Sequence, residues 1–291
     1  MSEPLSLSIA QAIVEAAQIL RKAGVPEARR EAASLLSYVT ARDRAFLIAH
    51  AETQLSASEV RRFGQFVERR AKGEPLQYIT HQQEFFSLDF EVTPDVLIPR
   101  PETELLVETA LELIPATAEA AAFCDVGTGS GCIAIALLHE RPRARGLGLD
   151  ISTAALGVAE RNASRHGVRD RLALVAADCF GAFDPARARF QLIVSNPPYI
   201  AADALAGLQR EVREHEPRLA LTPGGDGLGV IRRLVMDAPR FLLPGGHLLL
   251  EIGFDQHEAV ARLIDRGRWR LLGMHKDLQG IPRVVALQLV G

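Results

Sequence analysis

With 291 residues, 48% of them hydrophobic and 24% charged, the chain has the composition of an ordinary soluble globular protein and the length for one large and one small domain. Its net charge of −3 gives no overall attraction to nucleic acid. Cys124, Cys132 and Cys179 are an odd number without C-x-x-C spacing, so neither a disulfide framework nor a metal site is expected. We find no signal peptide and no apolar run of membrane-spanning length, so we expect a cytoplasmic protein without membrane contact.

Residues 1–75 have the periodicity of a small, all-helical unit. Two capping boxes predict helix starts, one formed by Ser8 with Gln11 and the other by Ser56 with Glu59. The outer face of the helix that follows Ser56 carries four arginines: Arg61, Arg62, Arg69 and Arg70. Such a face is either solvated or a docking surface for an acidic partner.

Residues 76–104 change to the alternating pattern of a half-buried strand or hairpin and then to a linker. The alternating apolar residues are Phe86, Leu88, Phe90 and Val92. The segment Ile98-Pro99-Arg100-Pro101-Glu102-Thr103-Glu104 leads into a helix in which Pro101 fits the first position. Arg100 either pairs with a nearby carboxylate and pins this segment, or the segment closes over a ligand or shapes a substrate channel.

Residues 105–291 alternate between strands and helices, which implies an α/β fold with a parallel sheet and helices on both of its faces. The expected strands are residues 122–126, 146–150, 172–176, 190–195 and 247–252. The expected helices are residues 131–140, 153–166, 226–242 and 256–267. Two further strands, 268–272 and 284–290, are predicted to close one edge of the sheet.

A glycine-rich loop, Gly127-Thr128-Gly129-Ser130-Gly131, follows the first of these strands and opens a helix. Glycines at this place let the backbone approach a ligand closely and leave helix N–H groups facing it. The G-x-G-x-G spacing does not match the G-x-G-x-x-G fingerprint of dinucleotide-binding proteins. A tight turn without a ligand would also account for the glycines.

Acidic residues follow the next two strands. Asp150 is placed to accept hydrogen bonds from both hydroxyls of a ribose, and Asp178 to meet the exocyclic amine of a nucleoside base. Three strand ends of this kind in succession predict a nucleoside-containing cofactor that crosses the carboxyl ends of the strands.

The fourth strand ends in Asn196-Pro197-Pro198-Tyr199, at the same edge of the sheet. The prolines stiffen the loop and leave carbonyl oxygens without neighbouring N–H donors. Asn196 adds a side-chain acceptor, and Tyr199 adds a flat aromatic face. These groups can hold a planar NH2 group in line with a methyl donor. Read alone, the four residues are equally compatible with an ordinary turn.

Together these motifs resemble those of the class I S-adenosylmethionine-dependent methyltransferases. More narrowly, the chain resembles the family that methylates the glutamine side-chain amide of peptide-chain release factors, and the resemblance covers almost the whole chain. The Asn-Pro-Pro-Tyr motif is shared with adenine-N6 methyltransferases, whereas the segment 98–104 is more particular to the release-factor family. Further matching motifs are Gly73-Glu74-Pro75-Leu76-Gln77-Tyr78-Ile79, Glu84-Phe85, Glu216-Pro217, Gly225-Asp226-Gly227-Leu228, Pro244-Gly245-Gly246, Glu251-Ile252-Gly253, Asp277-Leu278, Gly280 and Arg283.

The resemblance implies a Rossmann-like domain with a mostly parallel seven-stranded sheet over residues 105–291, a hairpin linker over 76–104 and a substrate-docking role for the helical domain 1–75. It implies S-adenosylmethionine as cofactor and release factors as protein substrates of a monomeric enzyme. The residues expected to bind the cofactor are Gly127, Thr128, Gly129, Ser130, Gly131, Asp150, Asp178, Cys179, Phe180 and Asn196. Those expected to bind the substrate are Asn196, Pro197, Pro198 and Tyr199, of which Asn196, Pro197 and Tyr199 are the expected catalytic residues.

Two positions depart from the family pattern. His81 stands where the family often has glycine, and it is either a tolerated loop residue or a catalytic base. Cys179 stands where the family often has tryptophan, so we expect the neighbouring Phe180 to substitute in packing against the adenine ring.

Two rival functions use the same residues differently. An adenine-N6 nucleic-acid methyltransferase would present the Asn-Pro-Pro-Tyr motif to a flipped base, but the acidic net charge and the lack of a target-recognition domain argue against it. A non-catalytic binding protein would keep the fold and lose the chemistry, but the intact glycine loop and Asp150 argue against such decay.

Overall fold

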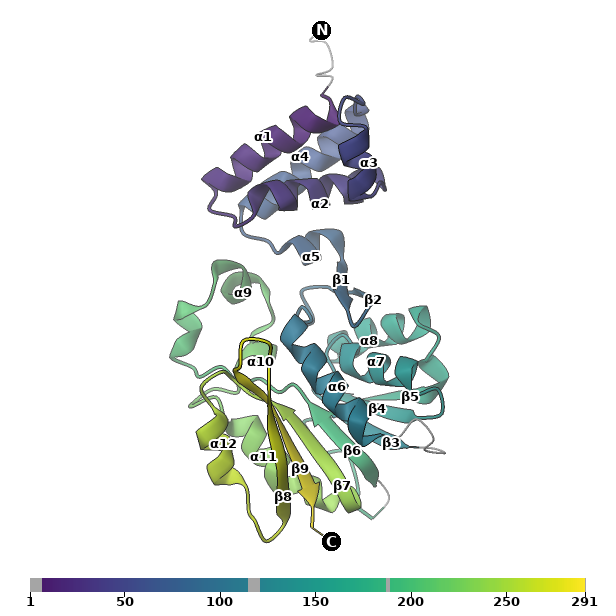
Figure 1. The fold of residues 1–291 in the computed structure, drawn as a ribbon, viewed down its shortest axis with the longest axis vertical. Helices are drawn as coiled ribbons and strands as arrows, with labels where there is room; N and C mark the ends of the chain where they lie inside the picture. The colour runs from purple at the N-terminus through teal and green to yellow at the C-terminus, as the bar shows by residue number, and fades with distance from the viewer. Residues whose placement is uncertain (1–6, 115–120, 187–188, 291) are drawn as a thin grey trace. The chain divides into compact units, whose positions relative to one another are not determined.

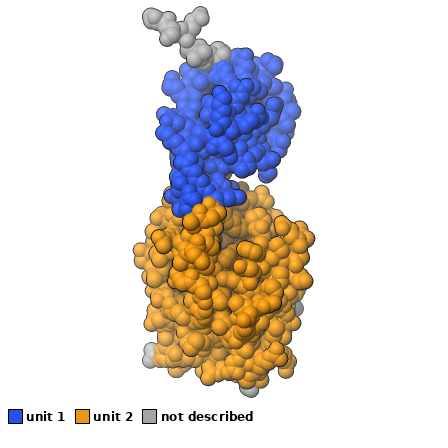
Figure 2. Space-filling model, turned by 90° about the vertical axis from the view of Figure 1, so that its left-hand side faces the viewer, with its two compact units in different colours: residues 1–81, 209–215 blue, residues 82–208, 216–291 orange. Residues whose placement is uncertain are grey.

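The computed structural model describes residues 7–114, 121–186 and 189–290. Residues 1–6 of the predicted domain 1–75 and residue 291 of the predicted domain 105–291 therefore lie outside the described residues. The chain forms two compact units, which Figure 2 distinguishes by colour. The first unit comprises residues 1–81 with 209–215, and the second comprises residues 82–208 with 216–291. The predicted linker 76–104 is thus divided between them, and a short segment from the middle of the second half of the chain belongs to the first unit.

The first unit is helical, as the sequence predicts (Figure 1). Both predicted capping boxes are confirmed: Ser8 and Gln11 at the start of α1, and Ser56 and Glu59 at the start of α4. The core of the unit is built from apolar side chains that recur at helical spacing, such as the fully buried Leu20. Its helices are α1 (Ile9–Lys22), α2 (Ala28–Thr40), α3 (Arg44–Ala49), α4 (Ala57–Ala71), α5 (Leu76–Thr80) and α9 (Arg210–His215).

Arg70 fits neither alternative for the arginine face of α4, because it is buried and paired within the unit. Its side chain is only 5% exposed and forms ion pairs with Glu31 of α2 and, at 2.6 Å, with Glu211 of α9. An arginine reaches two carboxylates because its planar guanidinium presents five donors. Arg62, in contrast, lies on the outer face, with its guanidinium over the ring of Phe66. The burial of Arg70 was invisible to the sequence pattern because one of its partners comes from a distant segment.

We expect Arg70→Met to destabilise the helical unit by about 3–5 kcal/mol, because it leaves two buried or half-buried carboxylates without their shared cation. Urea unfolding followed by circular dichroism measures this change. The matched control is Arg61→Met on the exposed face of the same helix, for which a change of at most about 0.5 kcal/mol is expected. Equal effects of the two substitutions would contradict the structural role of Arg70.

The second unit is built on a seven-stranded sheet of order β5-β4-β3-β6-β7-β9-β8. Strands β3 to β7 are parallel, and β9 runs antiparallel to both β7 and β8. The predicted α/β fold with a mostly parallel sheet is therefore confirmed. The strands are β3 (Ala122–Val126), β4 (Arg145–Asp150), β5 (Leu172–Ala176), β6 (Phe190–Ser195), β7 (Leu242–Glu251), β8 (Trp269–Lys276) and β9 (Pro282–Leu289).

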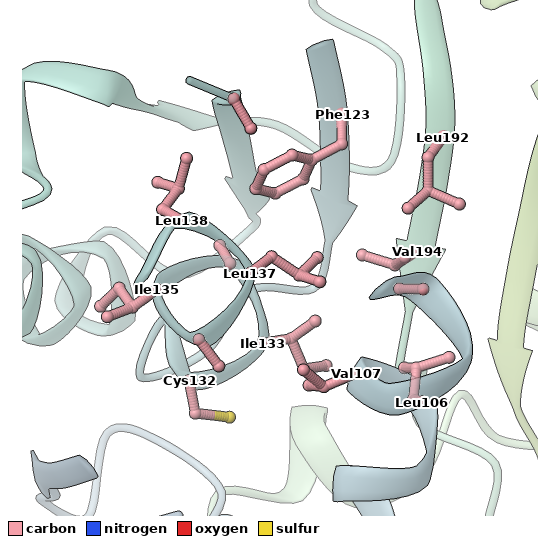
Figure 3. Packing of buried hydrophobic residues seen from close by; sticks show 14 of the residues in the cluster. Leu106, Val107, Phe123, Cys132, Ile133, Ile135, Leu137, Leu138, Leu192 and Val194 are labelled. Carbon is pink, nitrogen blue, oxygen red and sulfur yellow. The ribbon is translucent and has the colours of Figure 1, made fainter. Parts of the chain in front are cut away.

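Helices cover both faces of this sheet because alternate strand residues point to opposite sides. Phe123 of β3 and Leu192 of β6 pack against α6 and α7 (Figure 3), whereas Cys124 of β3 belongs to the cluster on the other face with Ile231 of α11. The helices are α6 (Glu104–Leu113), α7 (Cys132–Glu140), α8 (Thr153–Arg165), α10 (Arg218–Leu221), α11 (Gly229–Asp237) and α12 (His257–Leu263). Short 3-10 helices span Pro101–Thr103, Arg169–Arg171, Ala204–Gly207 and Ala238–Arg240.

Several element bounds differ from the prediction: for example, β7 begins at Leu242 where residue 247 was predicted, and α12 ends at Leu263 where residue 267 was predicted. The helix expected over 226–242 ends at Asp237 and continues only as a 3-10 turn, because Pro239 has no N–H group to donate within an α-helix. The hairpin strands are β1 (Gln82–Phe85) and β2 (Leu88–Glu91), so Phe86 lies in the turn and does not alternate with Leu88 as a strand residue. Its φ of 51° suits a two-residue hairpin turn, and its N–H donates to Glu104 at 2.9 Å.

Candidate active site

A cavity of about 330 Å³ lies at the carboxyl ends of the parallel strands of the second unit. This is where open α/β sheets bind ligands, and the strand ends predicted from the sequence meet there. Predicted site residues that line the cavity are Gly127, Thr128, Gly129, Ser130, Asp150, Asp178, Cys179, Asn196, Pro197 and Pro198. Gly131, Phe180 and Tyr199 do not line it.

The glycines of the loop 127–131 have two different roles. Gly129 has a φ of +55°, and a Cβ atom built on it would meet no protein atom within 4 Å, so this glycine keeps space open in front of the loop. Gly131 has a φ of +81°, but its Cβ would lie 2.9 Å from Cδ1 of Ile135 and 3.2 Å from Cβ of Ala159. Gly131 is therefore required by the close packing of α7 on α8, whereas Gly129 leaves room for a ligand.

Asp125, which the sequence reasoning did not assign, anchors this loop from below. Its Oδ2 accepts a hydrogen bond from the Thr128 hydroxyl at 2.7 Å, so the Thr128 side chain is engaged inside the protein. Burial raises the pKa of Asp125 to about 7, although the bond from Thr128 opposes the shift. The sequence feature that could have identified Asp125 is its place as a carboxylate within an otherwise apolar strand.

Asp150 is held rigidly at the end of β4. Its Oδ2 accepts from the N–H of Gly129 and its Oδ1 from the N–H of Ser152, both at 2.9 Å. Burial raises the pKa of Asp150, and the backbone N–H groups oppose the rise. Because each carboxylate oxygen has further acceptor capacity, both can still accept from the neighbouring hydroxyls of a ribose.

Of the three predicted site residues that follow β5, Asp178 and Cys179 line the cavity and Phe180 does not. Asp178 lines it but is also paired at 2.8 Å with the exposed Arg233. Cys179 lines it with a φ of +51°, and burial raises the pKa of its thiol to about 11. The ring of Phe180 instead stacks on Phe241, with 4.5 Å between their centroids, inside the hydrophobic core. The structure therefore does not place Phe180 where the expected adenine contact requires it.

Asn196 and Pro197 present two acceptors beside the glycine loop. The hydroxyl of Ser195 donates to the carbonyl of Val126 at 2.6 Å and so holds the end of β6 against the end of β3. Asn196 Nδ2 donates to Thr103 Oγ1 at 3.0 Å. Within the part of the chain that the structure describes, neither Asn196 Oδ1 nor the Pro197 carbonyl accepts a hydrogen bond. Both oxygens are thus available to a ligand.

Tyr199 has its polar groups engaged away from the cavity. Its hydroxyl donates to Glu251 Oε1 at 3.3 Å, and its carbonyl accepts from Gln256 Nε2 at 2.8 Å. Burial, reinforced by Glu251, raises the pKa of the Tyr199 hydroxyl. Tyr199 therefore stays protonated near neutral pH and holds the motif in place.

Arg100 pairs with the buried carboxylate of Glu216, which also accepts from the N–H of Ile98 at 3.3 Å. The predicted pairing of Arg100 with a carboxylate is confirmed, and Arg100 also lines the cavity. His81 belongs to the first unit and ends α5 with a φ of +55°. Glycine adopts this left-handed conformation without strain, so the backbone here suits the glycine that the family resemblance leads us to expect.

The far wall of the cavity was predicted only in part, as one of the two alternatives for the segment 98–104. It is formed by the segment before α6 and by the loop around α10, whose lining residues are Asp95, Val96, Leu97, Pro99, Arg100, Thr103, Pro217, Leu219, Ala220, Thr222 and Pro223. Of these, Thr103 contacts a predicted site residue directly. Its only signal in the sequence was its place in the motif 98–104.

A nucleoside-containing cofactor fits these residues. The open space in front of Gly129 accommodates a close backbone approach, and Asp150 offers acceptors for a ribose. Among residues 7–114, 121–186 and 189–290, no cluster of three or more His, Cys, Asp or Glu side chains is placed to hold a metal ion. No helix within these ranges is both long and apolar enough to span a membrane.

Two family models match this chain. The PrmC N-terminal domain model matches residues 11–80, and the methyltransferase small domain model matches residues 101–233. A methyltransferase structure from Pyrococcus furiosus has a TM-score of 0.51 and 16% identity, and covers 71% of this chain and 91% of its own, which shows the shared fold.

Much closer relatives cover nearly the whole sequence. The release factor glutamine methyltransferase of Cereibacter sphaeroides is 45% identical over 280 residues, which are 96% of this chain and 98% of that protein. The protein of the same name from Geobacter sulfurreducens is 46% identical over 266 residues, 91% of each chain. The chain therefore belongs to the release factor glutamine methyltransferase family.

Proposed function

We propose that this protein transfers the methyl group of S-adenosylmethionine to the side-chain amide nitrogen (N5) of the glutamine in the Gly-Gly-Gln motif of peptide-chain release factors. The observation that carries the proposal is the pair of free acceptors, Asn196 Oδ1 and the Pro197 carbonyl, on a cavity that also contains the Gly129 loop and Asp150. A primary amide has two N–H donors in one plane, and the two acceptors match them.

The cofactor is proposed to lie along the carboxyl ends of β3 and β4. Asp150 would accept from the ribose hydroxyls, and the loop at Gly129 would face the chain that carries the sulfur. When bound, S-adenosylmethionine supplies an electrophilic methyl group on its sulfonium. Asp178 and Cys179 line the same cavity and remain the predicted neighbours of the base.

The protein's task is to make an amide nitrogen reactive. The nitrogen lone pair is delocalised into the carbonyl group, which makes it a weak nucleophile. Two acceptors on the NH2 group stabilise the positive charge that grows on nitrogen and aim its lone pair at the methyl carbon. Alignment at about 3–3.5 Å is worth on the order of 7–11 kcal/mol. No histidine or lysine is found among the described residues that line the cavity, so the final proton is expected to leave to water.

The proposal is tested by methyl transfer from labelled S-adenosylmethionine. Purified unmethylated release factor, its Gln→Ala variant in the Gly-Gly-Gln motif, and unmethylated DNA and RNA are offered in parallel. A mass increase of one methyl group on that glutamine alone is the expected result. Label in nucleic acid would instead support the adenine-N6 alternative.

The helical unit is proposed to bind the release factor. The enzyme is proposed to act as a monomer in the cytoplasm. A pocket of the helical unit is lined by residues of α1, α2 and α3, among them the apolar Ile13 and Leu47, four arginines and a single acidic residue, Glu27. The arginines are Arg21, Arg29, Arg30 and Arg44, and none of them forms an ion pair with another described residue. Charge complementarity therefore favours an acidic segment of the release factor as the occupant.

We expect Arg29→Glu/Arg30→Glu to raise the KM for release factor about 10-fold and to leave kcat unchanged, because charges at the edge of an interface affect association more than chemistry. Initial rates against release-factor concentration provide the measurement. The matched control, Lys22→Glu/Arg61→Glu, makes the same change of charge on exposed positions of the same unit outside the pocket. An equal rise in KM for both variants would contradict the pocket as the docking site.

A further inference from the structure

The loop 196–199, which carries the two proposed acceptors, cannot hold its own middle in place. Pro197 and Pro198 have no N–H group, so the peptide bond that carries the Pro197 carbonyl has no donor with which to bind a neighbouring segment. The direction of this carbonyl therefore depends on the anchors at the two ends of the loop. At the first end, the hydroxyl of Ser195 donates to the carbonyl of Val126 at 2.6 Å.

The second anchor is the peptide bond between Tyr199 and Ile200. Its N–H group, from Ile200, donates to the carbonyl of Leu221 at 3.0 Å. Its carbonyl, from Tyr199, accepts from Nε2 of Gln256 at 2.8 Å. Because a peptide bond is planar, engaging both its donor and its acceptor fixes the orientation of the whole unit. The two hydrogen bonds thus set the direction in which the chain leaves the prolines.

Gln256 is held in a single orientation by its two partners. Its Oε1 accepts from the N–H of Gly253 at 2.9 Å, while its Nε2 donates to Tyr199. A backbone N–H only donates and a backbone carbonyl only accepts, so the amide cannot turn over without losing both hydrogen bonds. Gln256 occupies the N-cap position of α12, where a short side chain usually caps the helix. Here the side chain forms no capping bond with the described helix and reaches the loop instead.

Two glycines leave room for this hydrogen bond. A Cβ atom built on Gly227 would lie 2.3 Å from the carbonyl oxygen of Tyr199 and 3.1 Å from Nε2 of Gln256. A Cβ atom built on Gly253 would lie 3.1 Å from Oε1 of Gln256. A larger residue at either position would therefore displace one side of the hydrogen bond. Both glycines belong to motifs that the sequence shares with the release-factor family, and the bond gives a physical reason for each.

We propose that Gln256 is a positioning residue, which fixes the end of the loop 196–199 and thereby the direction in which the Pro197 carbonyl faces the cavity. Proline restricts its own φ to about −65°, so only a few rotatable bonds separate the Tyr199 carbonyl from the Pro197 carbonyl. A shift of the first is passed on to the second. The inference rests on the proposed function for what the Pro197 carbonyl binds, and on the geometry alone for the anchor.

The first test is Gln256→Glu, which keeps the shape of the side chain. The carboxylate still accepts from Gly253, but its second oxygen faces the Tyr199 carbonyl with an acceptor in place of a donor. Single-turnover methylation of release factor is expected to slow about 10- to 100-fold, the cost of a small misplacement in an active site. Affinity for S-adenosylhomocysteine is expected to stay within about twofold. Unchanged turnover, or an equal loss of cofactor affinity, would overturn the proposal.

The second test displaces the Tyr199 carbonyl from its other side. Gly227 and Gly224 have matching φ values of +79° and +81°, so alanine strains the backbone equally at both. Only at Gly227 does the added Cβ meet the Tyr199 oxygen, because a Cβ on Gly224 meets no atom within 4 Å. Gly227→Ala is therefore expected to slow single turnover about 10- to 100-fold, and Gly224→Ala less than about threefold. Equal slowing in both variants would overturn the proposal.

The double variant Gly227→Ala/Gln256→Glu tests whether the two residues act on the same hydrogen bond. Its turnover is expected to be no lower than that of the more affected single variant, because the bond can be lost only once. Multiplicative losses would show independent roles and overturn the proposal.

The third test is independent of activity. The chain has three tyrosines, so protein labelled with carbon-13 at the tyrosine carbonyl gives three signals, and that of Tyr199 is the one that Tyr199→Phe removes. This signal is expected to move upfield in Gln256→Leu, because the carbonyl carbon is less deshielded without its hydrogen bond, and to stay in place in Gly224→Ala. An unchanged signal in Gln256→Leu would overturn the proposal. A wild type that has the hydrogen-bonded carbonyl but does not methylate release factor would overturn the proposed function alone.

Discussion

Asn196→Ala is expected to lower kcat for release factor between about 100- and 1,000-fold, the range found when one preorganised hydrogen-bonding group is removed from an active site. The substitution removes Oδ1, one of the two acceptors that face the substrate amide, and leaves the Pro197 carbonyl in place. Single-turnover transfer of the labelled methyl group measures the effect on the chemical step.

Affinity for S-adenosylhomocysteine serves as the control for folding, and we expect Asn196→Ala to change it by less than about threefold, because the ribose and loop contacts proposed for Gly129 and Asp150 are intact. An unchanged kcat would remove Asn196 from the mechanism. A loss of cofactor affinity equal to the loss of kcat would make Asn196 a cofactor-binding residue instead.

Asp150→Asn is expected to weaken the binding of S-adenosylhomocysteine between about 10- and 150-fold, since a hydrogen bond to a charged group contributes about 1.5–3 kcal/mol. The asparagine amide supplies one acceptor oxygen where the carboxylate has two, and each carboxylate oxygen already accepts a backbone N–H. One ribose hydroxyl thus meets an NH2 donor. Isothermal titration calorimetry measures the change directly.

Asp178→Asn is the matched control for Asp150→Asn. It also removes one carboxylate from the cavity, but it retains an oxygen that can accept from a single base amine, and Asp178 is already paired with Arg233. A loss smaller than about 10-fold is therefore expected. If Asp178→Asn weakened binding more than Asp150→Asn did, the proposed orientation of the nucleoside across the strand ends would be wrong.

The sequence predicted best those features that depend on neighbouring residues. Strands β3, β5 and β6 begin and end where predicted, because each is an apolar run that stops at glycine, acidic or Asn-Pro residues. The convergence of Gly129, Asp150 and Asn196 also followed, since parallel strands place their carboxyl ends at one edge of the sheet.

What the sequence did not predict are side-chain contacts between distant segments. Asn196 bonds to Thr103 across 93 positions, and Tyr199 bonds to Glu251 across 52. Local periodicity carries no information on such pairs, because they are decided by which elements the tertiary fold brings together. The position of Phe180 was not predicted for the same reason: its aromatic ring stacks on Phe241, which lies 61 positions further along the chain, in the hydrophobic core.

The helical unit is built from two segments that are not contiguous in the sequence. Arg70 takes one of its two carboxylate partners, Glu211, from α9, and the side chain of Arg210 lies against Gly73. A chimaera that borrows residues 1–81 from one relative must therefore borrow 209–215 from the same relative, or its buried arginine would meet a foreign partner. Among relatives, substitutions in residues 1–81 and in residues 209–215 are therefore expected to occur together. This is expected although 127 residues of the other unit separate the two segments in the chain.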